Sequence, residues 1–202
     1  RVGKMGWQVE VVILTEGERG KNHTGEGDLG KIRKEEVERA VAVLGVDRLI
    51  RWRYPDGDLR KVRGWVSVLE RVIDKYDPGL VVSYDFSGMS GHPDHIISSL
   101  ELFGILRKRN ILLWWAVWPG FIRRFMVHLE VRSIMPKFDL RLDQDKGEHE
   151  RKCEAIGQHR SQLPNWSWWQ QLLFRNFIFR HEYFTLANYE REYEHKFVEF
   201  KF

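Results

Sequence analysis

The chain has 202 residues, of which 43% are hydrophobic and 13% aromatic, enough to bury the core of one domain. Its 33 basic and 29 acidic residues are interleaved and give a net charge of +4, an excess too small to indicate nucleic acid as a partner. The longest apolar stretch, residues 111–122, is shorter than the roughly 20 residues of a membrane-spanning helix. We therefore expect a single domain over residues 1–202 without a transmembrane span.

The chain has a lone cysteine, Cys153, which excludes an internal disulfide framework and fits a reducing compartment. The opening residues, RVGKMGWQ, have neither the long apolar region nor the cleavage site of a signal peptide. These features favour a cytoplasmic location. They leave peripheral contact with a membrane and formation of a homo-oligomer open.

Strands and helices are predicted to alternate from the start of the chain. The apolar, β-branched run at 9–15 predicts a buried parallel strand, and a Gly-rich loop follows it. Residues 30–44 predict a helix that Gly45 ends. The same unit repeats with a strand at 48–53, a PDGD turn, and a helix at 59–76 that stops before a proline.

A third unit follows, with a strand at 80–86, an SGMSG loop, a helix from Pro93 to about residue 108, and a strand at 111–117. Alternation of this kind predicts an α/β domain with a mostly parallel sheet and right-handed crossovers. Beyond Gly120 the regular alternation of strands and helices ends.

The last third of the chain is less regular. Residues 131–142 are expected to be extended and residues 148–159 helical, before an aromatic-rich segment at 166–179 and the sequence HEYF.

His92, Pro93, Asp94 and His95 stand where the strand at 80–86 gives way to a helix, and ligands of open parallel sheets bind outside the carboxyl ends of the strands. His92 and His95 are three apart across a helix start, so both rings can face one crevice, and imidazole is a common zinc ligand. Asp94 can orient one of the two rings without itself binding the metal. Without further evidence, the pair is equally well explained as hydrogen-bonding groups at a helix N-terminus.

The other histidines are scattered singly, and each is expected to be structural: His23, His128, His149, His159, His181 and His195.

Five short segments follow one another along the chain: TEGERG at 15–20, RKEE at 33–36, PDG at 55–57, SGHPDH at 90–95 and KCEAIGQHRSQ at 152–162. Their order resembles the succession in the PIG-L/LmbE family of zinc-dependent N-acetylglucosaminyl deacetylases. The resemblance covers about residues 9–184 and is most specific at GHPDH and at the H-x-S-Q ending. It implies a Rossmann-like three-layer α/β domain with a mostly parallel sheet.

The resemblance implies zinc-dependent hydrolysis of the N-acetyl group of an N-acetylglucosamine-containing substrate, such as a glycan or an inositol- or lipid-linked sugar. His95 corresponds to a zinc ligand. His92, supported by Asp94, corresponds to the catalytic group that stabilises the oxyanion or protonates the leaving amine. Zn²⁺ polarises the amide carbonyl and lowers the pKa of its bound water towards ~7, and a donor aimed at the oxyanion is worth roughly 3 kcal/mol.

Further residues match positions at which the family contacts its sugar. Arg33 and Asp56 are expected to hydrogen-bond sugar hydroxyls, and Glu18 and Gln162 are further substrate-contact candidates. Without the resemblance, Arg33 is better explained by a solvated helix face and Asp56 by a turn.

Family members open with a strand that ends in A-H-P-D-D-E, which supplies two more zinc ligands and the general-base aspartate, and residues 1–202 contain no such motif. The strand at 9–15 corresponds to the family's second strand, so the first βα unit, roughly 30 residues, is expected to be missing. We therefore expect this polypeptide alone to bind zinc weakly and to lack deacetylase activity. Two explanations stay open: an N-terminally truncated deacetylase, or a noncatalytic glycan- or nucleotide-binding α/β domain that has lost the opening motif.

Six of the nine tryptophans fall in two clusters, WWAVW at 114–118 and WSWW at 166–169. Core packing or an oligomer interface explains such clusters. The alternative is a face at a membrane interface, which suits a lipid-linked substrate.

Overall fold

The computed structural model divides the chain into two compact units, called unit 1 and unit 2 below. Unit 1 consists of Arg1–Leu59 and Leu142–Glu182, and unit 2 of Arg60–Arg141 and Tyr183–Phe202. The single domain expected from the sequence stays a prediction. The α/β class is confirmed, because strands and helices alternate as expected. The structure describes residues 5–25, 27–126, 129–163 and 180–190.

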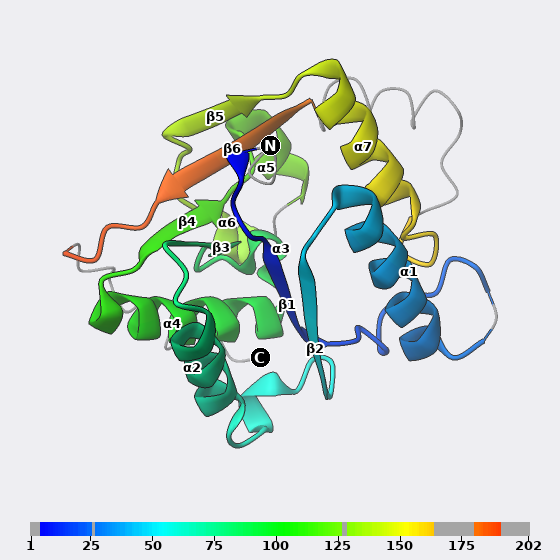
Figure 1. The fold of residues 1–202 in the computed structure, drawn as a ribbon, viewed down its shortest axis with the longest axis horizontal. Coiled ribbons are helices and arrows are strands. Elements are labelled where there is room, and N and C mark those ends of the chain that lie inside the picture. The colour runs from blue at the N-terminus through cyan, green and yellow to red at the C-terminus, as the bar shows by residue number, and fades with distance from the viewer. Residues whose placement is uncertain (1–4, 26, 127–128, 164–179, 191–202) are drawn as a thin grey trace. The chain divides into compact units, whose positions relative to one another are not determined.

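Unit 1 contains a parallel pair of strands, β1 (Glu10–Thr15) and β2 (Arg48–Tyr54), joined by the helix α1 (Leu29–Leu44) (Figure 1). The Asp28 carboxylate caps α1 by accepting the Lys31 N–H at 3.2 Å. The helix ends where Gly45 takes a left-handed conformation with φ of 69°, which glycine adopts without steric cost.

A second helix of unit 1, α7 (Lys146–Gly157), lies beside α1 (Figure 1). It begins with a reciprocal capping box in which the Asp145 side chain accepts the Glu148 N–H and the Glu148 side chain accepts the Asp145 N–H. The helix predicted at 148–159 is therefore confirmed, with its start two residues earlier.

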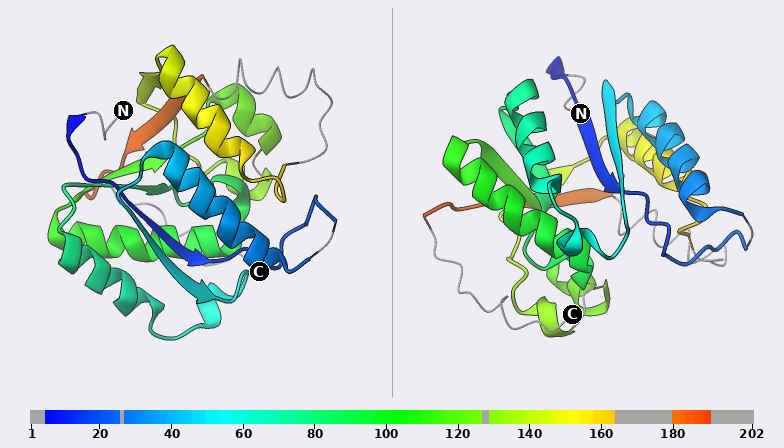
Figure 2. Two further views of the ribbon diagram at one scale, coloured as in Figure 1. Left: turned by 45° about the vertical axis from the view of Figure 1, so that its right-hand side comes forward. Right: turned by 90° about the horizontal axis from the view of Figure 1, so that it is seen from below.

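A second sheet has the strand order β3-β4-β6-β5. Strand β3 (Leu80–Tyr84) pairs in parallel with β4 (Leu112–Ala116), which pairs antiparallel with β6 (His181–Leu186). The helix α4 (Pro93–Arg109) connects β3 to β4, and α2 (Trp65–Tyr76) precedes β3 and lies beside α4 (Figure 2). The edge strand is β5 (Leu140–Asp143) and the short helices are α3 (Gly88–Gly91), α5 (Gly120–Met126) and α6 (Leu129–Arg132).

The predictions for residues 59–76 and 131–142 differ from the structure. The helix expected at 59–76 is interrupted: a 3₁₀ turn, η2 (Leu59–Lys61), is followed by α2 from Trp65, because Gly64 takes φ of 85°. The stretch expected to be extended from 131 to 142 includes the end of α6 and becomes a strand only at Leu140. The aromatic segment at 166–179 lies outside the described residues.

The two faces of β4 have different surroundings. Leu113 and Trp115 are 0% and 1% exposed, and the Trp115 ring packs against Phe86 and Phe103 with ring centroids 4.8 and 5.8 Å apart. Trp115 therefore belongs to the core, as one interpretation of its cluster expects.

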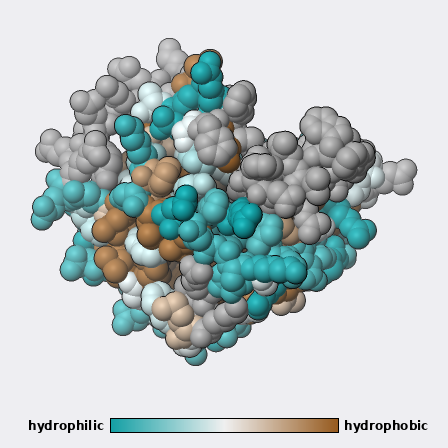
Figure 3. Space-filling model, turned by 90° about the horizontal axis from the view of Figure 1, so that it is seen from above, coloured by the Kyte–Doolittle hydropathy of each residue, from teal (hydrophilic) through white to brown (hydrophobic). Residues whose placement is uncertain are grey.

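The opposite face of this sheet carries Val82, Leu112 and Leu186, which are 53%, 53% and 48% exposed. Figure 3 shows one surface of the molecule on which hydrophobic residues gather beside hydrophilic ones. None of the helices in the described ranges has the length and apolarity needed to cross a membrane. Cytoplasmic location and peripheral membrane contact stay predictions.

Neighbouring leucines of β4 provide a matched test of this packing. We expect Leu113→Ala to lower the free energy of unfolding by about 2–5 kcal/mol, because it leaves a cavity at a fully buried site. Leu112→Ala should cost less than about 1 kcal/mol, because half of that side chain is exposed. Urea unfolding of both variants measures the difference, and equal losses would contradict the assignment of the two faces.

Candidate active site

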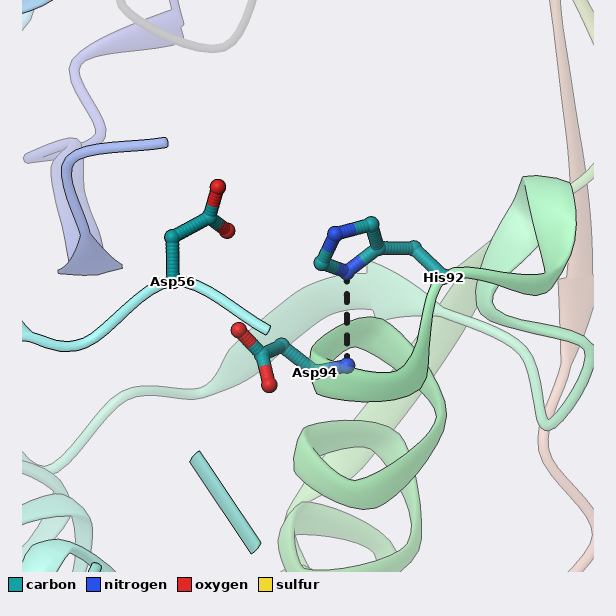
Figure 4. Close-up of side chains that lie close together, drawn as sticks. All are labelled: Asp56, His92 and Asp94. Atoms are coloured by element: carbon teal, nitrogen blue, oxygen red, sulfur yellow. Dashed lines mark hydrogen bonds between the residues drawn. The ribbon is translucent and has the colours of Figure 1, made fainter. Parts of the chain in front are cut away.

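His92 is held by the start of α4. It is the N-cap residue of this helix, with extended backbone angles (φ −66°, ψ 129°), and Pro93 follows at the first helical position, where its missing N–H removes no hydrogen bond. The Nδ1 atom of His92 accepts the Asp94 backbone N–H at 3.3 Å (Figure 4). Because a backbone N–H only donates, Nδ1 carries the lone pair, and the proton of the neutral ring is on Nε2.

The hydrogen bond of the His95 ring fixes the opposite tautomer. Its Nδ1 lies 3.1 Å from the Gly88 carbonyl oxygen. A carbonyl only accepts, so Nδ1 carries the proton and the lone pair of the neutral ring is on Nε2. The Tyr84 ring stacks on the His95 ring, with centroids 4.1 Å apart and planes at 20°. The structure thus makes Nε2 a donor in His92 and an acceptor in His95.

Gly88 is required for this arrangement. Its φ is 60°, and a Cβ at this position would lie 2.9 Å from the Cβ of His95 and 3.0 Å from the backbone nitrogen of Ile96. A side chain here would push α4 away from the loop that carries the carbonyl. The short helix α3, where the sequence predicted a loop, is interrupted by Met89 with φ of 62°.

The two histidines and Asp94 form one group in unit 2. The ring centroids of His92 and His95 are 4.9 Å apart, so the structure brings these rings together, as the spacing predicts. Asp94 is 4% exposed, and one of its carboxylate oxygens lies within 4.8 Å of a ring nitrogen of His92.

Asp85 is a buried carboxyl that sequence reasoning missed. It is fully buried and accepts the Ser87 Oγ–H at 2.8 Å and the Ser87 N–H at 3.3 Å. Burial raises the pKa of Asp85 to about 6, although these hydrogen bonds act in the opposite direction. The available signal was an acidic residue directly after the apolar strand LVVSY.

Arg33, on α1 in unit 1, binds the loop that follows β1. Its guanidinium donates to the Gly17 carbonyl and, at 3.4 Å, to the Lys21 carbonyl. A Cβ on Gly17 or Gly20 would lie 2.2 or 2.5 Å from guanidinium nitrogens, so both glycines make room for this side chain. The Nε of Arg33 is buried and finds no hydrogen-bond partner among the described residues. Burial lowers the pKa of Arg33, and nearby carboxylates, Asp56 first, act against this.

Asp56 lies in the turn after β2, also in unit 1, and is 7% exposed. Its Oδ2 accepts the Arg19 N–H at 3.3 Å, and its own N–H donates to the Glu18 carboxylate at 2.8 Å. The structure therefore brings Asp56 and Glu18 together within unit 1.

Gln162 and the segment before it are tied to α1 by Glu36, another buried carboxylate that the sequence did not single out. Glu36 is 1% exposed and accepts the Ser161 N–H at 2.7 Å and the Ser161 Oγ–H at 2.6 Å. Gln162 is exposed, and its Nε2 lies 3.2 Å from Nδ1 of His159. Burial lowers the pKa of His159, and the charge of Glu36 acts in the opposite direction.

Several known proteins resemble this chain. Over 122 residues it is 34% identical to a 1D-myo-inositol 2-acetamido-2-deoxy-alpha-D-glucopyranoside deacetylase from Mycolicibacterium gilvum, a match that covers 45% of this chain and 41% of the relative. The chain thus spans less than half the length of this curated relative.

Similar solved structures include an N,N'-diacetylchitobiose deacetylase from Pyrococcus horikoshii, with a TM-score of 0.69, 22% identity, and coverage of 94% of this chain and 76% of that one. An A40926 pseudoaglycone deacetylase has a TM-score of 0.68, 19% identity, and coverage of 94% and 89%. A 4-carboxy-2-hydroxymuconate hydratase from Pseudomonas putida has a TM-score of 0.62, 16% identity, and coverage of 93% and 87%. At these identities the likeness establishes the fold alone, which also carries a hydratase.

The fold is therefore the α/β fold of the PIG-L/LmbE deacetylases, as the sequence predicts. Residues 1–101, half of the chain, match the model of the GlcNAc-PI de-N-acetylase family, PIG-L. The chain belongs to this family.

The buried carboxyl of Asp85 generates a prediction for stability against pH. Its pKa is raised from 3.8 to about 6, so its contribution to stability is fully present below pH 3.8 and is lost as the pH rises through about 6. The shift of about 2 pKa units corresponds to about 3 kcal/mol. Between pH 4 and pH 7, urea unfolding should therefore show Asp85→Asn gaining stability relative to the natural sequence.

Asp74→Asn provides a control with a different pH window. The pKa of Asp74 is lowered from 3.8 by its hydrogen bond with Arg109, so its contribution to stability is present above pH 3.8 and is lost only as the pH falls below that value. Between pH 4 and pH 7 the stability of this variant should therefore follow that of the natural sequence. Stability curves of the natural sequence and Asp85→Asn that run parallel would contradict the burial of a charged carboxyl.

Proposed function

We propose that this chain is part of a zinc-dependent hydrolase that removes the N-acetyl group from an N-acetylglucosamine-containing substrate carried on a glycan, inositol or lipid. The proposal rests on the two Nε2 atoms: that of His92 carries a proton and that of His95 carries a lone pair. Amide hydrolysis at a metal needs both, a hydrogen-bond donor and a metal ligand. Membership of the family and the names of the relatives support the same reaction.

We assign His95 as a zinc ligand through Nε2. The chemistry of the atom fits, because zinc binds neutral imidazole nitrogens and their second nitrogen usually donates to a carbonyl or carboxylate, as Nδ1 does to Gly88. Zn²⁺, when bound, polarises the amide carbonyl and lowers the pKa of its water to near 7.

We assign the oxyanion-stabilising role to His92. Its Nε2–H is directed away from the helix backbone by the hydrogen bond at Nδ1, so it can donate a hydrogen bond to the oxyanion. Asp94, whose backbone N–H fixes the ring, is its supporting residue. Removal of the acetyl group then leaves acetate and a free amino sugar.

We assign Arg33, Asp56, Glu18 and Gln162 to the sugar. Asp56 and Glu18 offer carboxylate oxygens that accept from hydroxyls, and the buried Nε of Arg33 and the exposed amide of Gln162 offer donors.

A second candidate is a noncatalytic glycan- or nucleotide-binding domain, since residues 1–202 do not themselves supply the A-H-P-D-D-E motif. Under either proposal we expect residues 1–202 by themselves to bind zinc weakly and to show no turnover. Hydrolysis by this polypeptide would overturn the assignment of the general base to the motif that it lacks.

Ligand binding tests the proposed substrate class without requiring turnover. Saturation-transfer NMR with an N-acetylglucosaminyl-inositol should show transfer to the acetyl methyl group. Asp56→Asn should weaken binding about tenfold, the effect of one charge-assisted hydrogen bond. Asp58→Asn, two residues away and paired with Arg19, is the matched control and should bind like the natural sequence. Saturation transfer to a nucleotide but not to the acetyl sugar would favour the second candidate.

A further inference from the structure

The turn before α4 carries the carbonyl that binds the His95 ring. This carbonyl belongs to Gly88 and lies 3.1 Å from Nδ1 of His95. The turn begins at Asp85, whose side chain is fully buried.

The Asp85 carboxylate holds the residue that precedes Gly88. Ser87 donates both its Oγ–H and its N–H to this carboxylate, and the Gly88 N–H donates to the Asp85 carbonyl at 2.9 Å. The segment that it holds includes two left-handed residues in succession, Gly88 with φ of 60° and Met89 with φ of 62°. A non-glycine residue in such a conformation persists only where its surroundings fix it, and the buried carboxylate does this.

We propose that Asp85 is a positioning residue for His95: by binding Ser87 it fixes the turn that presents the Gly88 carbonyl to Nδ1, which keeps the ring proton on Nδ1 and the lone pair on Nε2. The arrangement resembles the carboxylate–histidine pairs that orient metal ligands, with the backbone of the turn between the two members.

The functional meaning rests on the proposed function, since it takes Nε2 of His95 as a metal ligand. The tautomer itself is a property of the metal-free chain and can be measured without activity. A residue that only stabilised the fold would change the free energy of unfolding and leave the His95 tautomer unchanged.

Long-range ¹H–¹⁵N NMR of the full chain at about pH 8, where an ordinary imidazole is neutral, measures the tautomer ratio. In Asp85→Asn the amide NH₂ replaces one acceptor oxygen and removes an acceptor for the N–H or the Oγ–H of Ser87. The ratio of Nδ1–H to Nε2–H forms of His95 should fall about fivefold or more, as expected for loss of one hydrogen bond. Ser87→Ala, which removes one donor to the carboxylate, should shift the ratio in the same direction by less.

Ser161→Ala is the matched control, because Ser161 is equally buried and donates its hydroxyl to a buried carboxylate, Glu36, in unit 1. It should leave the His95 ratio unchanged. The proposal would be overturned if the His95 tautomer ratio of folded Asp85→Asn equalled that of the natural sequence. If Asp85→Asn does not fold, the same result in folded Ser87→Ala would overturn it.

Calorimetric titration of the natural chain and of His95→Ala with Zn²⁺ tests the proposed function separately. Equal zinc binding by both would refute His95 as a ligand and leave the tautomer result standing.

Discussion

The hydrogen bond from Nδ1 of His95 to the Gly88 carbonyl decides which ring nitrogen is available for chemistry. It exists because β3 ends in a turn whose glycine has no Cβ to separate the loop from α4. The same helix start fixes His92 in the opposite tautomer through the Asp94 N–H. Two half-buried histidines at the same helix start therefore take different tautomers, because a backbone N–H faces Nδ1 of one and a backbone carbonyl faces Nδ1 of the other.

In unit 1, buried charged side chains fix the positions of the loops. Glu36 joins α1 to Ser161, 125 residues further along the chain, through two short hydrogen bonds. Arg33, one turn earlier on α1, closes the loop after β1, and Gly17 and Gly20 leave space for it. An unpaired buried carboxylate or guanidinium is costly, so these contacts strongly constrain the loops that carry Glu18 and Gln162.

Much of the fold followed from sequence periodicity, because β1, α1, β3 and α4 have clear apolar patterns bounded by Gly45 or Pro93. The break in the predicted helix at 59–76 was missed because a glycine inside a helical pattern does not reveal its φ. Asp85 and Glu36 were missed because burial of a carboxyl depends on partners distant in sequence or in the next turn. The positions of His92 and His95 were predictable, but the tautomer of His95 depends on a carbonyl placed by two left-handed residues, and that of His92 on the Asp94 N–H.

The central claim is that His95 presents Nε2 to the metal while Nδ1 stays bound to Gly88. Anomalous diffraction at the zinc edge, from crystals of the chain soaked in Zn²⁺, tests it most directly. The account predicts zinc about 2.0–2.1 Å from Nε2 of His95, with the Nδ1 to Gly88 hydrogen bond retained. Zinc on Nδ1 of His95, or on His92 with none on His95, would contradict it.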